Sequence, residues 1–134
     1  MTAVIVAAVL FSFSFLSEKA SVNLNISDDD FVREGAAITK QVEVSQWSNL
    51  ITISLFSDPS SGYEWELREL TDSNAIKMVS NEYFDSEMDE ISGQEVWTFD
   101  VRKSGTSTIS MEYSQPQTNG IKALRRFDVV VVAQ

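Results

Sequence analysis

The stretch that decides the fold is WTFDVRKSGTSTISMEY, residues 97–113. Apolar side chains recur at every second position on both sides of its centre: Trp97, Phe99 and Val101, then Ile109, Met111 and Tyr113. Such alternation is typical of strands with one buried face, because successive side chains point to opposite faces of a sheet. Between the two runs, Lys103-Ser104-Gly105 supplies turn residues. The stretch therefore predicts two strands joined by a short turn.

The same period of two extends outward in both directions. It recurs in residues 42–44, 51–56, 63–68 and 76–84. A nearly continuous apolar run from Phe127 to Val132 is expected of a central strand that is covered on both faces. Short strands at a spacing of about 8–12 residues predict an all-β fold, an immunoglobulin-like β-sandwich of about seven to eight strands. No internal repeat and no helix is predicted.

Composition excludes several classes of function. The 134 residues are enough for one domain, and the net charge of -10 argues against nucleic acid and anionic membrane surfaces as partners. The sequence contains no cysteine and no histidine, so Ser-His, Cys-His, zinc and haem chemistry lose their usual residues. Carboxylate-only hydrolysis and an oxygen-ligand metal site stay open on composition alone. We expect no enzyme, no cofactor and no metal.

The N-terminus predicts export. Residues 1–20 are interpreted as a signal peptide, because the apolar run from Ala3 to Leu16 is too short for a stable membrane span. The alternative is a strand built on the alternating Phe11, Phe13 and Phe15. The sequon Asn25-Ile26-Ser27 fits a secreted protein or one in the secretory or lysosomal pathway. Residues 21–39 are polar and acidic, and we expect a lead-in there, before a sandwich domain at residues 40–134.

One predicted connection combines conformational restriction with polar side chains. In Asp58-Pro59-Ser60-Ser61-Gly62-Tyr63, proline fixes its own φ and glycine allows a positive φ. The two serines would present hydroxyls on this stiff platform, with Trp65 packed beneath. Taken alone, the segment indicates an ordinary β-turn.

Four segments together resemble a known family. Residues 58–65, DPSSGYEW, resemble the Asn-Pro-Thr-Thr-Gly-aromatic-x-Trp signature of the chagasin family of cysteine-protease inhibitors. Asn81-Glu82-Tyr83-Phe84 looks like that family's Asn-x-Tyr-Phe stretch, and residues 101–106, VRKSGT, resemble the strand and turn that follow. Tyr113-Ser114-Gln115-Pro116-Gln117 stands where the family has Tyr-x-Arg-Pro-Trp. The resemblance covers about residues 41–134 with order and spacing kept.

The resemblance implies a function. Family members are reversible, tight-binding inhibitors of papain-like, cathepsin-type cysteine proteases, and three loops from one end of the sandwich occlude the active-site cleft. For this chain it implies a monomer whose protease-binding residues are Asp58, Pro59, Ser60, Ser61, Gly62, Tyr63, Ser92, Gly93, Gln94, Gln115, Pro116 and Gln117.

The chain departs from the family pattern in two of these loops. Glu90-Ile91-Ser92-Gly93 replaces Gly-x-Gly-Gly, so one glycine remains in the central loop. Gln115 and Gln117 replace Arg and Trp, the residue types most enriched among interface hot spots. We therefore expect weaker or differently targeted inhibition than the family pattern implies.

Three other functions are compatible with parts of the sequence. A non-inhibitory immunoglobulin-like binding or adhesion module would keep the scaffold while its loops changed. A calcium site would use the acidic segment Asp85, Glu87, Asp89 and Glu90, which does not match the EF-hand pattern. A carbohydrate platform would use Tyr63, Trp65, Trp97 and Phe99, but their spacing of two favours a core position.

Overall fold

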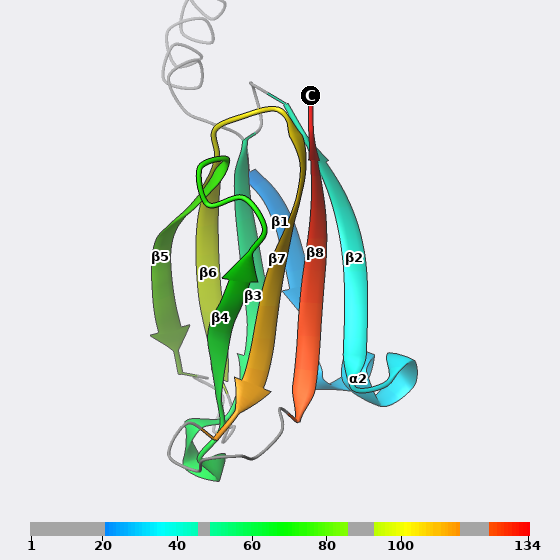
Figure 1. Cartoon of the computed structure of the whole chain (residues 1–134). Coiled ribbons are helices and arrows are strands. Elements are labelled where there is room, and N and C mark those ends of the chain that lie inside the picture. Colours follow the sequence, from blue (N-terminus) through cyan, green and yellow to red (C-terminus); the bar gives the residue numbers. More distant parts are fainter. Residues whose placement is uncertain (1–20, 46–48, 86–92, 116–123) are drawn as a thin grey trace, which may run out of the picture.

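Eight strands and one short helix form the described part of the chain (Figure 1). The computed structural model describes residues 21–45, 49–85, 93–115 and 124–134. In chain order the elements are β1 (Ser21–Ile26), α2 (Asp28–Glu34), β2 (Ala37–Val44), β3 (Leu50–Ser57), β4 (Glu64–Leu70), β5 (Ile76–Phe84), β6 (Gly93–Val101), β7 (Gly105–Ser114) and β8 (Arg125–Ala133). No helix within these ranges is long and apolar enough to cross a membrane.

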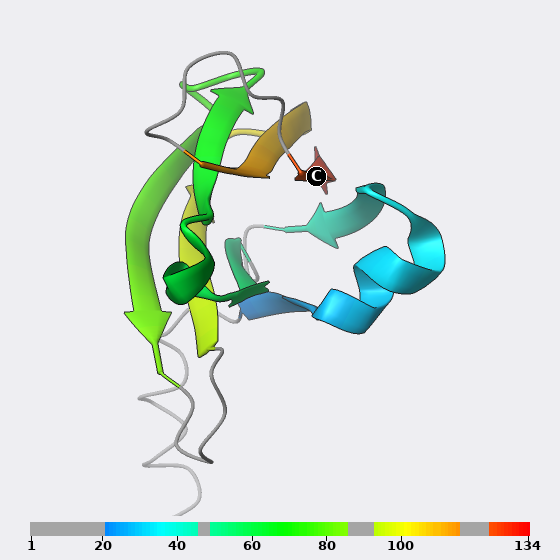
Figure 2. The ribbon, with the colours of Figure 1, turned by 90° about the horizontal axis from the view of Figure 1, so that it is seen from below.

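The strands form two four-stranded sheets. Sheet A has the order β1-β3-β6-β5, and sheet B has the order β2-β8-β7-β4. The pairs β1–β3 and β2–β8 are parallel, and the other pairs are antiparallel. Viewed from below, α2 lies at one side of the sandwich, where the chain passes from β1 to β2 (Figure 2). The predicted all-β sandwich is confirmed.

The core lies between the sheets and follows the predicted alternation. Every second residue of the central strands is buried: Ile51, Ile53 and Leu55, Trp97, Phe99 and Val101, Ile109, Met111 and Tyr113, and Phe127, Val129 and Val131. Trp65 is buried as well. The interpretation of Trp65, Trp97 and Phe99 as core residues, not an exposed carbohydrate platform, is thus confirmed. Tyr63, the fourth aromatic residue of that set, is only half-buried and packs at the margin of the core.

Strand β8 differs from its prediction. It is central, between β2 and β7, but its burial alternates, so Val129 and Val131 are buried while Val130 and Val132 are half-exposed. The expectation of a strand covered on both faces was wrong, because the described residues form only two layers and the outer face of sheet B stays partly exposed.

The expected lead-in over residues 21–39 is instead built into the sandwich. In β1, Val22, Leu24 and Ile26 lie against the core, and the strand pairs in parallel with β3. The expected domain start at residue 40 falls inside β2. The apolar alternation of β1 is short and interrupted by polar residues. Its parallel partner lies about 29 residues away in the chain, as in the pair Val22 and Ile51, so no turn beside β1 marks the pairing in the sequence.

The prediction of no helix was also wrong. Ser27 caps α2: its hydroxyl accepts from Asp30 N–H at 3.3 Å, and the Asp30 carboxylate accepts from Ser27 N–H at 2.8 Å. This is a capping box, which satisfies amide groups at the helix start. The helix has seven residues, too few to show a period of 3.6, and it buries one side chain, Phe31. Tertiary packing therefore decides whether it forms.

Candidate functional site

Three connections gather at one end of the sandwich, here called the loop end (Figure 1). Strands β3, β5 and β7 finish there and β4, β6 and β8 begin there, as the pairs Ser57–Gly93, Glu64–Ser114 and Tyr113–Arg125 show. The sequence predicted binding residues in all three connections. Of these, Ser92, Pro116 and Gln117 lie outside the described residues.

Residues 58–62 form a tight turn between β3 and β4, called the 58–62 turn below. Ser61 N–H donates to Asp58 O and Gly62 N–H donates to Pro59 O, both at 3.0 Å. Pro59 is the first residue of a single 3-10 turn, where its missing N–H is not needed. Gly62 ends the turn at φ 85°, a left-handed conformation that glycine adopts without the steric cost of a Cβ. The chain thus reverses without a flexible segment.

The serine hydroxyls are used within the turn. Ser60 Oγ donates to Asp58 Oδ1 at 2.6 Å. Ser61 Oγ donates to Asp58 O at 2.6 Å and accepts from Tyr63 N–H at 3.2 Å. Both side chains remain exposed. The hydroxyls therefore brace the turn, and what the turn presents to solvent is a stiff polar ridge.

An aromatic cluster supports the 58–62 turn from beneath. The ring centroids of Trp65 and Tyr113 lie 5.0 Å apart, and those of Tyr63 and Tyr113 lie 5.5 Å apart. Tyr113 Oη accepts from Asp58 N–H at 3.2 Å, which ties the cluster to the turn. The predicted position of Trp65 beneath the turn is confirmed. Sequence reasoning missed Phe31 of α2, whose ring centroid lies 5.8 Å from that of Trp65.

The second and third connections each place a described residue beside the others. A Cβ on Gly93 would lie 2.1 Å from Phe84 O and 2.7 Å from Tyr83 Oη, so only glycine fits there. Gln94 follows it on the outer face of sheet A. Gln115 Nε2 lies 3.4 Å from where a Gly62 Cβ would stand, so the third connection touches the first.

A buried carboxylate lies below the turn, and sequence reasoning missed it. Glu95 Oε2 accepts from Ser57 Oγ at 3.0 Å and from Trp65 N–H at 3.2 Å. Burial raises the pKa of Glu95, and these two hydrogen bonds oppose that shift. One signal was present in the sequence: Glu95 stands in the apolar phase of Gly93-Glu95-Trp97-Phe99-Val101.

Comparison with known proteins identifies the family. The sequence profile described as chagasin family peptidase inhibitor I42 matches residues 45–131. The chain belongs to the chagasin family. The loop end of this chagasin-family chain is therefore its candidate inhibitory surface, and the chain belongs to a family of peptidase inhibitors, not of enzymes.

Solved structures agree on the fold. The cysteine protease inhibitor EhICP2 from Entamoeba histolytica has a TM-score of 0.63 and 20% identity, over 87% of this chain and 100% of that one. The solution structure of amebosin has a TM-score of 0.56 and 17% identity, over 73% of this chain and 96% of that one. No curated protein matches the sequence.

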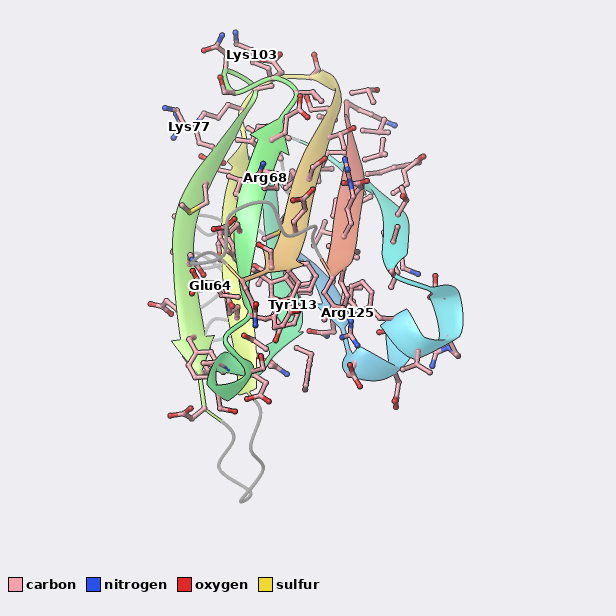
Figure 3. The ribbon with its side chains drawn as sticks, turned by 60° about the horizontal axis from the view of Figure 1, so that its bottom comes forward. Glu64, Arg68, Lys77, Lys103, Tyr113 and Arg125 are labelled. Carbon is pink, nitrogen blue, oxygen red and sulfur yellow. The ribbon has the colours of Figure 1, made fainter. Side chains whose placement is uncertain are left out.

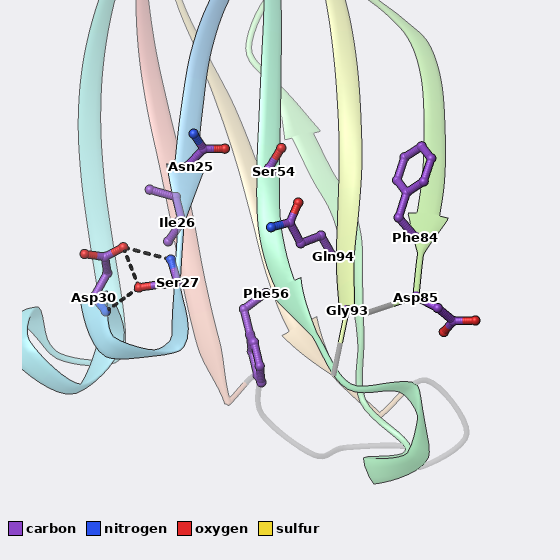
Figure 4. Close-up of a pocket in the computed structure, with 10 residues that line it drawn as sticks. All are labelled: Asn25, Ile26, Ser27, Asp30, Ser54, Phe56, Phe84, Asp85, Gly93 and Gln94. Atoms are coloured by element: carbon purple, nitrogen blue, oxygen red, sulfur yellow. Dashed lines mark hydrogen bonds between the residues drawn. The ribbon is translucent and has the colours of Figure 1, made fainter. Parts of the chain in front are cut away.

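A hollow of about 450 Å³ opens on the outer face of sheet A at the loop end (Figure 4). Phe56 and Phe84 contribute its apolar surface, and Phe84 is 52% exposed. Asn25 of the sequon, Ser54 and Gln94 line it as well. Since Gly93 also lines it, the hollow adjoins the second connection of the chagasin-family surface.

Charge is unevenly distributed along the sandwich. Glu64 and Arg125 lie toward the loop end, whereas Lys77 and Lys103 lie toward the opposite end (Figure 3). At the loop end Arg125 pairs with Asp28 at 2.6 Å and Arg33 pairs with Asp30 at 2.5 Å, so both cations are neutralised. Asp58 and Asp85 add negative charge there.

Across the described ranges, no three ligand-type side chains gather closely enough to hold a metal ion. Of the proposed calcium ligands, Glu87, Asp89 and Glu90 lie outside those ranges.

Proposed function

We propose that this protein is a reversible inhibitor of papain-like cysteine proteases and that its loop end occludes the active-site cleft. Membership of the chagasin family supports the inhibitory role. The geometry that supports this mode of inhibition is the 58–62 turn, which is held by its own hydrogen bonds and rests on an aromatic cluster.

The proposed mechanism is steric and needs no reaction by the inhibitor. A turn that is already ordered loses little conformational entropy on binding, so more of the contact free energy appears as affinity. The same bracing opposes the extended conformation that a protease needs in order to cleave a peptide. The sequence, without cysteine or histidine, supplies neither a thiolate nor an imidazole for covalent chemistry.

The proposed contact surface includes residues from all three connections. Asp58, Pro59, Ser60, Ser61, Gly62 and Tyr63 form its centre, Ser92, Gly93 and Gln94 one flank, and Gln115, Pro116 and Gln117 the other. The glutamines at 115 and 117 lack the cation and the indole of the family pattern. We therefore expect inhibition that is weaker than the family pattern implies, or directed at different proteases.

Titration of papain and several cathepsins with the purified protein tests the proposal. We expect stoichiometric, reversible loss of protease activity. Ser60→Trp places a bulky ring on the exposed ridge and should abolish inhibition with little change in melting temperature. Ser104→Trp, a matched change in the exposed turn before β7, should leave inhibition intact. Absence of inhibition at micromolar wild-type protein across the panel would refute the proposal.

We also propose that the protein is secreted or enters the secretory or lysosomal pathway, with residues 1–20 removed as a signal peptide. The apolar run before residue 17 and the sequon at Asn25 support this. Mass spectrometry of the protein expressed in a eukaryotic secretory host tests both points. A mature protein that begins at Met1 and lacks glycan would contradict them.

A further inference from the structure

The 58–62 turn spans the gap between the two sheets, and its two stems have no common strand partner. Ser57 ends β3 in sheet A, and Trp65 is the second residue of β4 in sheet B. Strand β4 is the edge of sheet B, so among the described strands none pairs with the other side of its backbone. The spacing of the stems therefore depends on side chains beneath the turn.

Glu95 connects the stems. It is the third residue of β6, it pairs with Leu55 of β3, and its side chain points into the sandwich with 8% exposure. One oxygen, Oε2, accepts from Ser57 Oγ at 3.0 Å and from Trp65 N–H at 3.2 Å. This one oxygen atom thus binds both the end of β3 and the start of β4, which lie in opposite sheets.

The position is unfavourable for an ionised carboxylate, because burial removes its hydration. Its neighbours on β6 that share its face, Gly93 and Trp97, are buried. Among the described residues, no cation lines the cleft of about 370 Å³ that Glu95 borders. Glu64 of β4 and Tyr83 of β5 also line this cleft. Hydrogen bonds to a charged acceptor are the stronger kind, which offsets part of the desolvation cost.

We propose that Glu95 is a positioning residue of the inhibitory surface, which holds the two stems of the 58–62 turn at the spacing that fits the protease. The inference rests on the proposed function, because it explains how the inhibitory turn is kept ready. Without the acceptor, Trp65 N–H is left unpaired at the base of the turn, and only a fraction of molecules would hold the competent spacing. The apparent dissociation constant rises by the inverse of that fraction.

Three variants and two measurements test this proposal. Glu95→Ala removes the acceptor, Glu95→Gln keeps an acceptor oxygen of the same reach, and Ser107→Ala changes a buried polar residue near the opposite end of β7. The measurements are the inhibition constant against papain and the hydrogen-exchange rate of the Trp65 amide. We expect Glu95→Ala to raise both by about tenfold. Glu95→Gln and Ser107→Ala should stay within about twofold of the wild type.

Each contrary outcome overturns the proposal. Unchanged exchange at Trp65 in Glu95→Ala would mean that the carboxylate does not hold the stem. Faster exchange with unchanged inhibition would mean that stem spacing does not set affinity. Equal weakening by Glu95→Gln would mean that charge acts, not the acceptor. If Glu95→Ala does not fold, Ser57→Ala removes one of the two bonds, and we expect about a threefold rise in both quantities. If the wild type inhibits no protease, the proposed function fails, while the exchange measurement still tests whether Glu95 holds the turn.

Discussion

At the scale of single residues, Gly93 shows how one position constrains the loop end. A Cβ there would meet Phe84 O at 2.1 Å, and backbone atoms cannot move aside as the end of a side chain can. We expect Gly93→Ala to destabilise the protein by about 1–3 kcal/mol, because the end of the β5–β6 pair must separate. Urea unfolding measures the change. Gln94→Ala, one residue along on the outer face, is the control, and equal stability of the two variants would contradict the explanation.

Asp58 caps the turn with an acceptor oxygen, and we expect this oxygen to matter more than the charge. Its Oδ1 accepts from Ser60 N–H at 3.2 Å and from Ser60 Oγ at 2.6 Å. Asparagine keeps such an oxygen, so we expect Asp58→Asn to inhibit papain like the wild type. Asp58→Ala should lose about 1 kcal/mol of stability, which is typical of a lost cap, and should inhibit more weakly. Inhibition constants and melting temperatures of both variants check this. If Asp58→Asn weakens inhibition as much as Asp58→Ala does, the charge of Asp58 and not its acceptor oxygen is what matters.

Glu95 also makes a prediction about pH. Burial raises its pKa, so the folded state binds this proton more tightly than the unfolded state does. The free energy of unfolding then falls as pH rises through the ordinary carboxyl pKa toward the raised one. Glu64 and Tyr83, which share the cleft, supply no compensating cation. We expect Glu95→Gln to be more stable than the wild type at pH 7.5, with a smaller difference at pH 3.5. Urea unfolding at both pH values decides, and a difference independent of pH would contradict this reasoning.

At the scale of elements, α2 links β1 to the loop end. Its Phe31 packs on Trp65, and Arg125 of β8 lies 4.9 Å above the Phe31 ring. The helix is short, so its capping box matters. We expect Ser27→Ala to cost about 1 kcal/mol in urea unfolding. Ser27→Thr, which keeps the hydroxyl, should cost much less, and equal losses would show that the cap is not what holds α2.

At the scale of the whole molecule, the acidic loop end predicts how the inhibitor meets its target. A surface of one sign attracts a partner of the other sign before contact, and salt screens this attraction. For a protease with a basic cleft rim, we expect the association rate to fall about tenfold between 0.05 and 0.5 M salt. The dissociation rate should change much less. Stopped-flow association measures both trends, and an association rate insensitive to salt would contradict a role for this charge.

The sequence by itself determined the sandwich and the 58–62 turn. The apolar–polar alternation of β6 and β7 is clear in the sequence because each strand places one face on the core. The 58–62 turn is clear because Pro59 and Gly62 determine the backbone conformation locally. Only the tertiary structure decided the rest. Strand β1 and helix α2 form against partners distant in the chain, so neither shows a strong local pattern. The sequence shows Glu95 as a charged residue at an apolar position of the alternation. Its hydrogen-bond partners, Ser57 and Trp65, cannot be read from the sequence, because only the packing of the two sheets brings them to one oxygen.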